Sequence, residues 1–548
     1  MKRWIWAVFF IASAILCLTG IFWGLPAGYN ADEPHIMNLA VSFGGGSLRP
    51  AFFKYPTLYP YLLAFFYGLY FVIWSGFGCL HTVADFIGLY AWQPTMFYLI
   101  GRTFSAVCAL SAVAVMFRSE RRWRPTGWPW AALLLAFCPL VVELAHAAKP
   151  DCLMVLFVCI AWSFILRLYH EGGRRWHWAA GLALGLAMSS QYTSVFVCAA
   201  AVLAHFLSKE RQPRTWLWEG AAAVGLGFIG GSPYILLDFP NFWASMRDLA
   251  DLAGLSAWDR GATVMQVLRN VWEFAGAWSL AGLGLALGAI RLWRVERGLA
   301  LVFLGPIAAY VLGLGNNPDG SGPRYLMGAF PGLALLAAEG LSWLAALTGR
   351  WTAAAVLAGA IGPGLWWCAG YDRGLLLPDT RGQATQWLRS HVPPGKTLLM
   401  DLPHAAPDLW MTREQVEALA EQTRRAGSPR ARLYQGMVLT HPGGGWRIYR
   451  IQRSARDMRT SPRQVQLAQA DAPTLDVAGG LPAAQALGVE YVVLSEYGAN
   501  PRRTPQLAAF FSDLERQAVL ERRFDPVPGR VAGPGLKIYR IAGTKRRA

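Results

Sequence analysis

The sequence predicts a mainly helical, polytopic membrane protein with a soluble α/β domain at its C-terminal end. Of the 548 residues, 54% are hydrophobic and only 15% are charged, whereas soluble globular proteins have about 25% charged residues. Long apolar runs recur up to about residue 370 and then stop. The remaining residues are polar and rich in Arg, Pro and Gly. We therefore expect a membrane module over residues 1–370 and an extracytoplasmic domain over residues 371–548.

The formal net charge of +17 could indicate a nucleic-acid-binding protein. Lys and Arg, however, gather in short clusters between the apolar runs, as expected where they mark the cytoplasmic ends of membrane spans. We therefore expect membrane lipids, and no nucleic acid, as partners. The eight cysteines lie almost entirely inside apolar runs and show no paired spacing, which is typical of small hydrophobic residues.

Twelve apolar runs approach the roughly 20 residues that a membrane span needs. Five basic clusters separate many of them, and all five should be cytoplasmic. The runs lie at about 4–25, 57–80, 96–117, 127–145, 152–168, 178–190, 193–208, 217–236, 270–290, 299–314, 325–347 and 352–370.

The number of spans before each basic cluster must place that cluster on the cytoplasmic side, a parity constraint. With Lys2 and Arg3 inside, a crossing by residues 57–80 would put the basic cluster at 118–124 outside and invert every later cluster. We therefore predict that 57–80 lies along the membrane or re-enters from the outer face, which suits the Tyr and Pro residues around its start. This leaves about eleven spans, a cytoplasmic N-terminus and a C-terminal domain outside.

The first apolar run is either an uncleaved anchor or a signal peptide. Its start is basic, as in a signal peptide, but it is longer than a usual h-region and has no clear small-x-small cleavage site. We expect an anchor. Both alternatives leave the next segment, the first outer loop at 26–95, outside the cytoplasm.

Asp32 and Glu33 open that outer loop and are the first candidates for a functional site. Apolar residues then recur at helical spacing up to Gly44, with Pro34 in the first turn, which predicts an amphipathic interfacial helix. Asp32 is either the N-cap of this helix or a general base, and the two roles are compatible because both need a fixed carboxylate.

A second acid and several cations share the predicted outer face. Lys149-Pro150-Asp151 opens the span at 152–168, where Asp151 could also be only a helix cap. Lys54, Arg102 and Arg324 either contact lipid headgroups or neutralise a phosphate. His146 also lies outside, although no His, Cys and Asp spacing resembles a zinc set.

Several segments in order resemble the GT-C membrane glycosyltransferases, in particular the protein O-mannosyltransferase-like family 39 and the aminoarabinose transferases. The resemblance covers about residues 1–370, and two stretches of the tail also resemble bacterial members. Its motifs are DEPHIMNLAVSFGGG, FKYPTLYPYLLAFFYGL, GRTFSAVCALSAVAVMF, AHAAKPDCLMVLF, GLALGLAMSSQYTSVFV, SPYILLDFPNFW and RYLMGAFPGLALLAA.

The resemblance implies a GT-C fold in a bacterial inner membrane and transfer of a sugar from a polyprenyl-phosphate donor to an acceptor with inversion. It implies Asp32 as the catalytic base, Glu33 in support and Asp151 as a second acidic position. It implies no metal; a divalent ion is possible but is not predicted. The residues expected to contact substrate are Lys54, Tyr55, Arg102, His146, Lys149, Arg324 and Tyr325.

The sequence departs from the family pattern at two places. Thr57 follows Lys54-Tyr55-Pro56 where relatives often carry a second proline, and Gln191 stands where many carry lysine. The second departure argues against a charged contribution of residues 190–193 to phosphate binding.

Two other classes of protein fit part of the pattern. A transporter or flippase would also bury charge, but here the ionisable residues collect in outer loops and no inverted repeat is evident. A membrane assembly protein with an outer interaction domain is the third possibility. The sugar and the acceptor, whether glycan, lipid or protein, are not predicted.

In the tail, the pattern predicts strands at 396–401, 490–495 and 537–541 and helices at 413–426 and 505–522.

Overall fold

The structure is a computed structural model, and it describes most of the chain. The residues outside the description are 1–2, 51, 126, 253–263, 266–267, 270–279, 314–322, 348–349, 428–429, 453–471, 497–506 and 542–548. The described residues form two compact units. Unit 1 comprises Met1–Ile21, Leu48–Leu62 and Gly101–Asp372, and unit 2 comprises Phe22–Ser47, Leu63–Ile100 and Arg373–Ala548. The predicted domain boundary at residue 370 stays a prediction.

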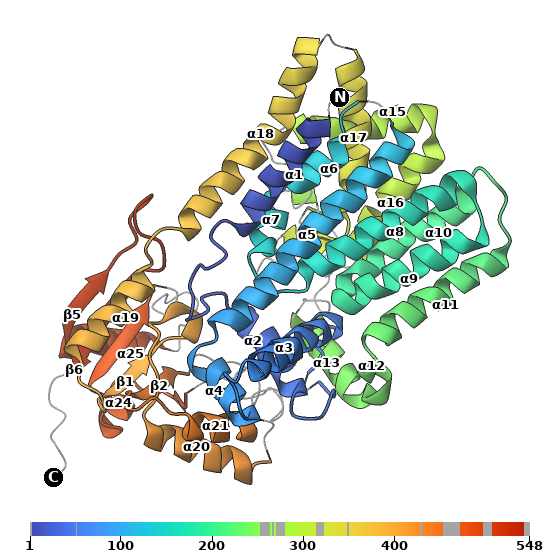
Figure 1. The fold of residues 1–548 in the computed structure, drawn as a ribbon. Coiled ribbons are helices and arrows are strands. Elements are labelled where there is room, and N and C mark those ends of the chain that lie inside the picture. The colour runs from blue at the N-terminus through green and yellow to red at the C-terminus, as the bar shows by residue number, and fades with distance from the viewer. Residues whose placement is uncertain are drawn as a thin grey trace. The chain divides into compact units, whose positions relative to one another are not determined.

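Every element that the structure describes up to Leu375 is a helix (Figure 1). Their bounds are α1 Arg3–Leu18, α2 Glu33–Phe43, α3 Leu58–Gly76, α4 Val83–Trp92, α5 Thr95–Trp123, α6 Trp130–Ala136, α7 Pro139–Ala145, α8 Asp151–Glu171, α9 Arg174–Ser190, α10 Cys198–Leu207, α11 Arg214–Gly231, α12 Tyr234–Leu237, α13 Phe239–Leu252, α15 Leu280–Val295, α16 Arg297–Gly313, α17 Phe330–Ala346 and α18 Arg350–Leu375.

Four described helices are long and apolar enough to cross a membrane: Leu58–Gly76, Thr95–Trp123, Asp151–Glu171 and Thr352–Leu375. Others are shorter than the apolar runs from which they were predicted. The run at 127–145, for example, divides into α6 and α7, because Pro139 lacks the N–H that would continue α6. The first ten residues of the run at 270–290 lie outside the described residues. The number of spans stays a prediction.

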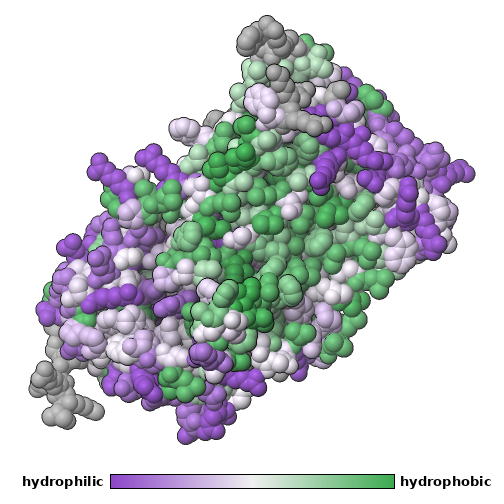
Figure 2. Space-filling view, in the orientation of Figure 1, coloured by the Kyte–Doolittle hydropathy of each residue, from purple (hydrophilic) through white to green (hydrophobic). Residues whose placement is uncertain are grey.

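Helix α3 bears on the parity argument. It is continuous over 19 residues, and its length and composition suit a crossing, whereas the positions of the basic clusters predict that it does not cross. Its path along or through the membrane therefore stays a prediction. Figure 2 shows apolar side chains gathered over α5, a surface suited to lipid.

Ion pairs in unit 1 connect the clusters that were predicted to be cytoplasmic. Glu339 on α17 pairs with both Arg124 and Arg291, so that the clusters after α5 and α15 lie at one end of the unit. Such grouping is expected of clusters that share a membrane face. The other pairs at these positions are Arg122–Glu171 at 2.8 Å, Arg174–Glu219 at 2.6 Å and Lys209–Glu296 at 2.7 Å.

Unit 2 contains a six-stranded sheet in the order β3-β2-β1-β4-β6-β5. The strands β1, β2, β3 and β4 are parallel to one another where they pair, and β6 is antiparallel to both β4 and β5. Their bounds are β1 Thr397–Met400, β2 Arg447–Ile451, β3 Thr474–Leu475, β4 Tyr491–Ser495, β5 Ala518–Phe524 and β6 Leu536–Ile541.

Both faces of this sheet are buried. In β1, Leu398 and Met400 belong to one apolar core, with α19 (Thr380–His391), α20 (Arg413–Arg425) and α21 (Ala431–Leu439). Leu399 between them belongs to the other, with α24 (Pro482–Ala486) and α25 (Ala508–Gln517). Alternate side chains of a strand point to opposite faces, so helices cover the sheet on both sides. The predicted α/β character of the tail is confirmed.

The predicted elements of the tail are largely confirmed. The three predicted strands match β1, β4 and β6, and the first predicted helix matches α20. The helix predicted at 505–522 is wrong in its last five residues, because 518–522 belong to β5, which pairs with β6. Long-range strand pairing outweighs the local helical pattern there. Residues 505–506 lie outside the described part of the chain.

The helix predicted after Asp32 is confirmed as α2, which ends before Gly44 and has Pro34 in its first turn. Within unit 2, α4 also packs on the tail. Helix α4 contacts α21, and the indole Nε1 of Trp92 donates to the hydroxyl of Thr440 at 3.1 Å.

Close backbone contact in unit 1 depends on small residues. Helix α9 packs on α11, and a Cβ added at Gly185 would lie 2.2 Å from the carbonyl oxygen of Val224. Without a strong hydrophobic drive between helices in lipid, such contact supplies much of the packing energy.

We predict that Gly185→Ala lowers the stability of unit 1. The new methyl group forces the two helix backbones apart, and overpacking of this kind costs about 1–3 kcal/mol. Thermal unfolding of the detergent-purified protein should show a midpoint several degrees lower. Gly225→Ala on α11 is the matched control, because nothing lies within 4 Å of its added Cβ; an equal loss in both variants would contradict the packing argument.

Candidate functional site

Asp32 occupies the N-cap position of α2 but does not cap it with its side chain. Among the described residues, the Asp32 carboxylate accepts no capping hydrogen bond from a backbone N–H of α2. The φ and ψ of Asp32, −89° and −28°, are already helical. Its backbone N–H donates to Oδ1 of Asn30 at 3.0 Å, while Glu33, the first residue of α2, is fully buried. The turn is therefore well defined, and capping does not account for the Asp32 carboxylate.

In unit 2, the Asp32 carboxylate lies within electrostatic reach of the imidazole of His404. Burial lowers the pKa of His404 below its usual value, and the nearby guanidinium groups of Arg381 and Arg450 lower it further. Asp32 acts in the opposite direction and raises it. The predicted base therefore has His404 of the tail as an electrostatic neighbour, and Arg381 and Arg450 also act on this histidine.

Sequence reasoning missed His404, Arg381 and Arg450. They lie far from Asp32 in the sequence and belong to separate elements of the tail. Arg381 falls within a stretch that resembles bacterial family members, which is the one signal that could have pointed to it.

Asp151 is the centre of a second group, in unit 1. It is the first residue of α8, with Pro150 at the cap position and no side-chain cap bond described. The carboxylate is completely buried, and its Oδ1 lies 3.4 Å from Nε of Arg324. A buried carboxylate needs such a counter-charge, and the N-terminus of α8 adds a favourable dipole. The structure thus brings together two predicted residues that lie far apart in the sequence.

Arg324 belongs to the short helix Pro323–Leu326, and its guanidinium lies 5.7 Å from the ring centre of Tyr325, another predicted residue. Its side chain keeps 22% of its surface exposed, whereas its Nε, which faces the acid, is buried. Glu143, which sequence reasoning missed inside an apolar run, interacts electrostatically with both Arg324 and Lys149.

Arg102, His146 and Lys149 are all buried in unit 1. Arg102 is only 1% exposed and donates to the carbonyl oxygen of Ile21 at 2.7 Å. Contact with lipid headgroups, the alternative for Arg102, is therefore wrong, because a side chain that reaches headgroups extends to the surface. Arg102 also interacts electrostatically with His146.

His146 is held between two backbone carbonyl groups. Its Nδ1 lies 2.8 Å from the oxygen of Val142, and its Nε2 lies 2.7 Å from that of Thr19. Nε2 also lies 3.7 Å from the carboxylate of Asp372 near the end of α18. These contacts fix the ring from two sides, which suits a positioning role more than direct contact with substrate.

The bend that carries Lys54 and Tyr55 is anchored within unit 1 at Phe53, the residue before Lys54. Tyr192 donates its hydroxyl hydrogen to the carbonyl of Phe53 at 3.0 Å, and the N–H of Phe53 donates to the hydroxyl of Ser245 at 3.3 Å. Lys54 and Tyr55 themselves are half-buried. A cation on an anchored bend is suited to hold an anion in a fixed place.

The departure from the family pattern at Thr57 has a structural reason. Its backbone N–H donates to the hydroxyl of Ser232 at 3.0 Å, and its own hydroxyl donates to the carbonyl of Gly231 at 3.4 Å. A proline has no N–H to donate. Thr57 therefore replaces the rigidity of a second proline with hydrogen bonds to the segment after α11.

Comparison with known proteins confirms the resemblance. Residues 96–237 match the model of the dolichyl-phosphate-mannose-protein mannosyltransferase family. No protein of curated function matches the sequence. Among solved structures, ArnT from Cupriavidus metallidurans bound to undecaprenyl phosphate is 13% identical over 100% of both chains, with a TM-score of 0.52.

The apo form of the same ArnT is 15% identical over 97% of both chains, with a TM-score of 0.51. An Archaeoglobus fulgidus oligosaccharyltransferase is 12% identical over 97% of this chain and 74% of its own, with a TM-score of 0.46. At such identities the ArnT matches define the fold alone. The chain therefore has the GT-C fold, and its residues 96–237 carry the sequence pattern of the dolichyl-phosphate-mannose-protein mannosyltransferase family.

Proposed function

We propose that this protein is an inverting glycosyltransferase that moves a sugar from a polyprenyl-phosphate donor to an acceptor hydroxyl on the outer face of the membrane. The observation that carries the proposal is the family match over 96–237, because this segment includes Arg102, His146, Lys149 and Asp151. The family's description names a dolichyl-phosphate sugar, and the ArnT relative binds undecaprenyl phosphate. Both are polyprenyl phosphates.

Charge development explains why the reaction needs cations. When the bond between the anomeric carbon and the phosphate oxygen breaks, its electron pair stays on that oxygen. The lipid phosphate thereby becomes a monoester and gains negative charge. Lys and Arg placed beforehand in a water-poor cavity stabilise this charge as it forms. Lys54 on its anchored bend and the partly exposed side chain of Arg324 are the proposed contacts.

The acceptor supplies the other half of the reaction. Its hydroxyl oxygen attacks the anomeric carbon from the face opposite the leaving phosphate, and its proton passes to the carboxylate of Asp32, with inversion at that carbon. Because a polyprenyl phosphate already leaves readily, one general base suffices. Asp151 plays a different part, since it is buried against Arg324 and holds that guanidinium in place.

We predict that Asp32→Asn lowers sugar transfer by about 10²–10⁴-fold, the usual contribution of a general base. The protein in liposomes would receive a panel of labelled undecaprenyl-phosphate-linked hexoses and pentoses, with an extract of the host membranes as acceptor. Labelled covalent product would be measured. Asp248→Asn, which removes an exposed carboxylate on α13, should keep the wild-type rate.

Full transfer by Asp32→Asn would contradict the assignment of the base. If the wild-type protein moves labelled lipid across the bilayer and forms no covalent product, this would support the transporter alternative. The proposed transferase activity would then be wrong.

Binding of the lipid phosphate should depend on the cations and not on Asp32. Loss of one hydrogen bond to a charged group costs about 1.5–3 kcal/mol, so Lys54→Ala should weaken undecaprenyl phosphate binding about 10- to 100-fold. Asp151→Asn combined with Arg324→Gln should weaken undecaprenyl phosphate binding to a similar extent, because neither change leaves the other charge buried alone. Titration of the tryptophan fluorescence with undecaprenyl phosphate would measure the affinity of each variant.

Two controls separate this effect from general loss of charge. Arg211→Ala removes an exposed cation between α10 and α11 and should leave the affinity unchanged, as should Asp32→Asn. Equal affinity in Lys54→Ala and the wild type would rule out a contact between Lys54 and the phosphate.

A further inference from the structure

Arg381 is a buried guanidinium in unit 2 whose orientation is fixed by its hydrogen bonds. It is the second residue of α19 and is 6% exposed. Its Nε and Nη2 donate to the two carboxylate oxygens of Asp379 at 2.8 and 2.7 Å, and its Nη1 donates to the carbonyl of His404 at 2.6 Å. Burial of a guanidinium is unfavourable unless its donors are paired in this way.

The face of the same guanidinium lies against the turn that leads to Asp32. Its central carbon is 3.6 Å from the ring centre of Tyr29 and 5.7 Å from that of Trp23. Tyr29 is itself nearly buried. A cation over an aromatic face in a dry environment is a strong contact, so Arg381 holds the ring of Tyr29 at the start of α19.

Only two residues separate Tyr29 from Asp32, and the turn between them is closed by the hydrogen bond from the Asp32 N–H to Asn30. Displacement of Tyr29 therefore displaces Asp32. Arg381 also binds the backbone of His404, whose imidazole interacts with the Asp32 carboxylate. The Arg381 guanidinium thus fixes both the turn that carries Asp32 and the backbone of His404.

We infer that Arg381 is a positioning residue for the proposed base, acting through Tyr29 to hold Asp32 at its place beside His404. The inference rests on the proposed function. It makes the C-terminal domain part of the catalytic arrangement, since the geometry of the base then depends on α19.

A positioning role and a purely structural role differ in what they change. A structural contact, when lost, reduces the amount of folded protein but leaves the turnover of the folded fraction intact. Loss of positioning reduces kcat in the folded fraction, because misplacement of a catalytic group by about 1 Å can cost about 10²-fold. It leaves KM for the donor nearly unchanged, because the proposed phosphate contacts lie on other elements.

Four variants test this with the labelled undecaprenyl-phosphate-sugar panel, each normalised to folded protein that binds undecaprenyl phosphate. Tyr29→Leu and Arg381→Gln should lower kcat about 10- to 100-fold, with KM within about twofold. Tyr29→Phe keeps the aromatic face and should restore nearly full kcat. Arg381→Lys keeps the charge but loses the planar fork, so its kcat should lie between those of Arg381→Gln and the wild type.

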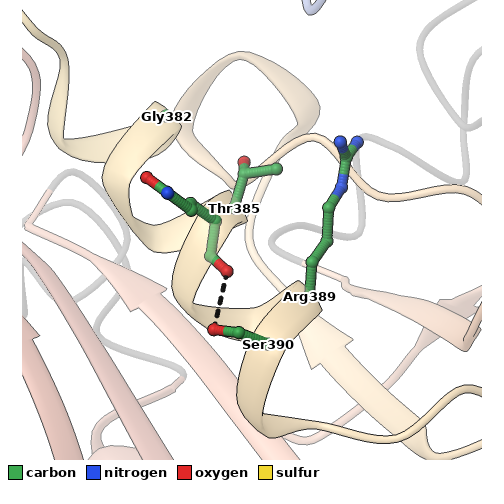
Figure 3. Close-up of a pocket in the computed structure, with 5 residues that line it drawn as sticks. Gly382, Thr385, Arg389 and Ser390 are labelled. Carbon is green, nitrogen blue, oxygen red and sulfur yellow. Dashed lines mark hydrogen bonds between the residues drawn. The ribbon is translucent and has the colours of Figure 1, made fainter.

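Arg389 on the same helix gives a matched control. Its guanidinium also lies over an indole, that of Trp410 at 4.9 Å, and donates to a backbone carbonyl, that of Asp408 at 3.1 Å. Arg389 lines a pocket of about 420 Å³ together with other residues of α19, and Figure 3 shows how these side chains lie. Arg389→Gln removes the same chemistry away from the Asp32 turn and should leave kcat unchanged.

A second measurement does not depend on catalysis. In histidine-labelled protein, NMR titration reports the pKa of His404, identified by the signal absent from His404→Gln. Because Asp32 raises this pKa, Asp32→Asn should lower it. Tyr29→Leu should also lower the pKa of His404, because the released turn moves Asp32 away from the imidazole. Tyr29→Phe should leave this pKa unchanged.

Wild-type kcat together with an unchanged His404 pKa in Tyr29→Leu would overturn the inference. If Asp32→Asn retains full transfer, the proposed base is wrong, and the NMR titration still reports whether Tyr29 holds Asp32 beside His404. The two failures are therefore distinguishable.

Discussion

The cost of placing charge in an apolar environment governs the membrane part of this protein. Asp151 is completely buried at the start of α8, and it is stable there because Arg324 lies 3.4 Å away and the helix dipole favours a negative charge. Arg102 meets the same requirement through a backbone carbonyl. Each buried charge thus needs a partner from a distant part of the chain, and these partners join segments that the sequence separates widely.

The same constraint distinguishes two kinds of charged group in unit 1. Pairs such as Arg122–Glu171 and Lys209–Glu296 are partly exposed and connect helix ends, where an ion pair contributes little net stability. The group around Asp151 and Lys149 is buried, so its charges are weakly screened and act strongly on anything bound beside them. An environment of that kind suits the stabilisation of a phosphate that gains charge as it leaves.

In unit 2 the same reasoning applies to the acid itself. Asp32 stands at the start of α2 without serving as its cap, and its electrostatic neighbour His404 belongs to the tail of the chain. The tail is therefore more than an appendage of the membrane module: α19 and the segment around His404 form part of the surroundings of the proposed base. Polar contacts from a rigid α/β core hold such a residue more firmly than a long loop alone.

Much of the architecture follows from local pattern. The apolar runs predicted helices, the spacing after Asp32 predicted α2, and short segments of strand-like pattern in the tail predicted β1, β4 and β6. Several elements could not be predicted in this way. Strand β5 replaces the end of a predicted helix because pairing with β6 outweighs local preference, and α6 and α7 divide one apolar run at a proline.

What the sequence by itself determined is therefore the membrane character, the helical periodicity and the residue types of the proposed phosphate site, because composition and spacing depend only on neighbouring residues. Tertiary structure alone decided the partners: Arg324 for Asp151, Ser232 for Thr57, and Arg381 for Tyr29. Such pairings join residues that lie far apart in the chain, and their energies depend on distance and burial, which no local pattern encodes.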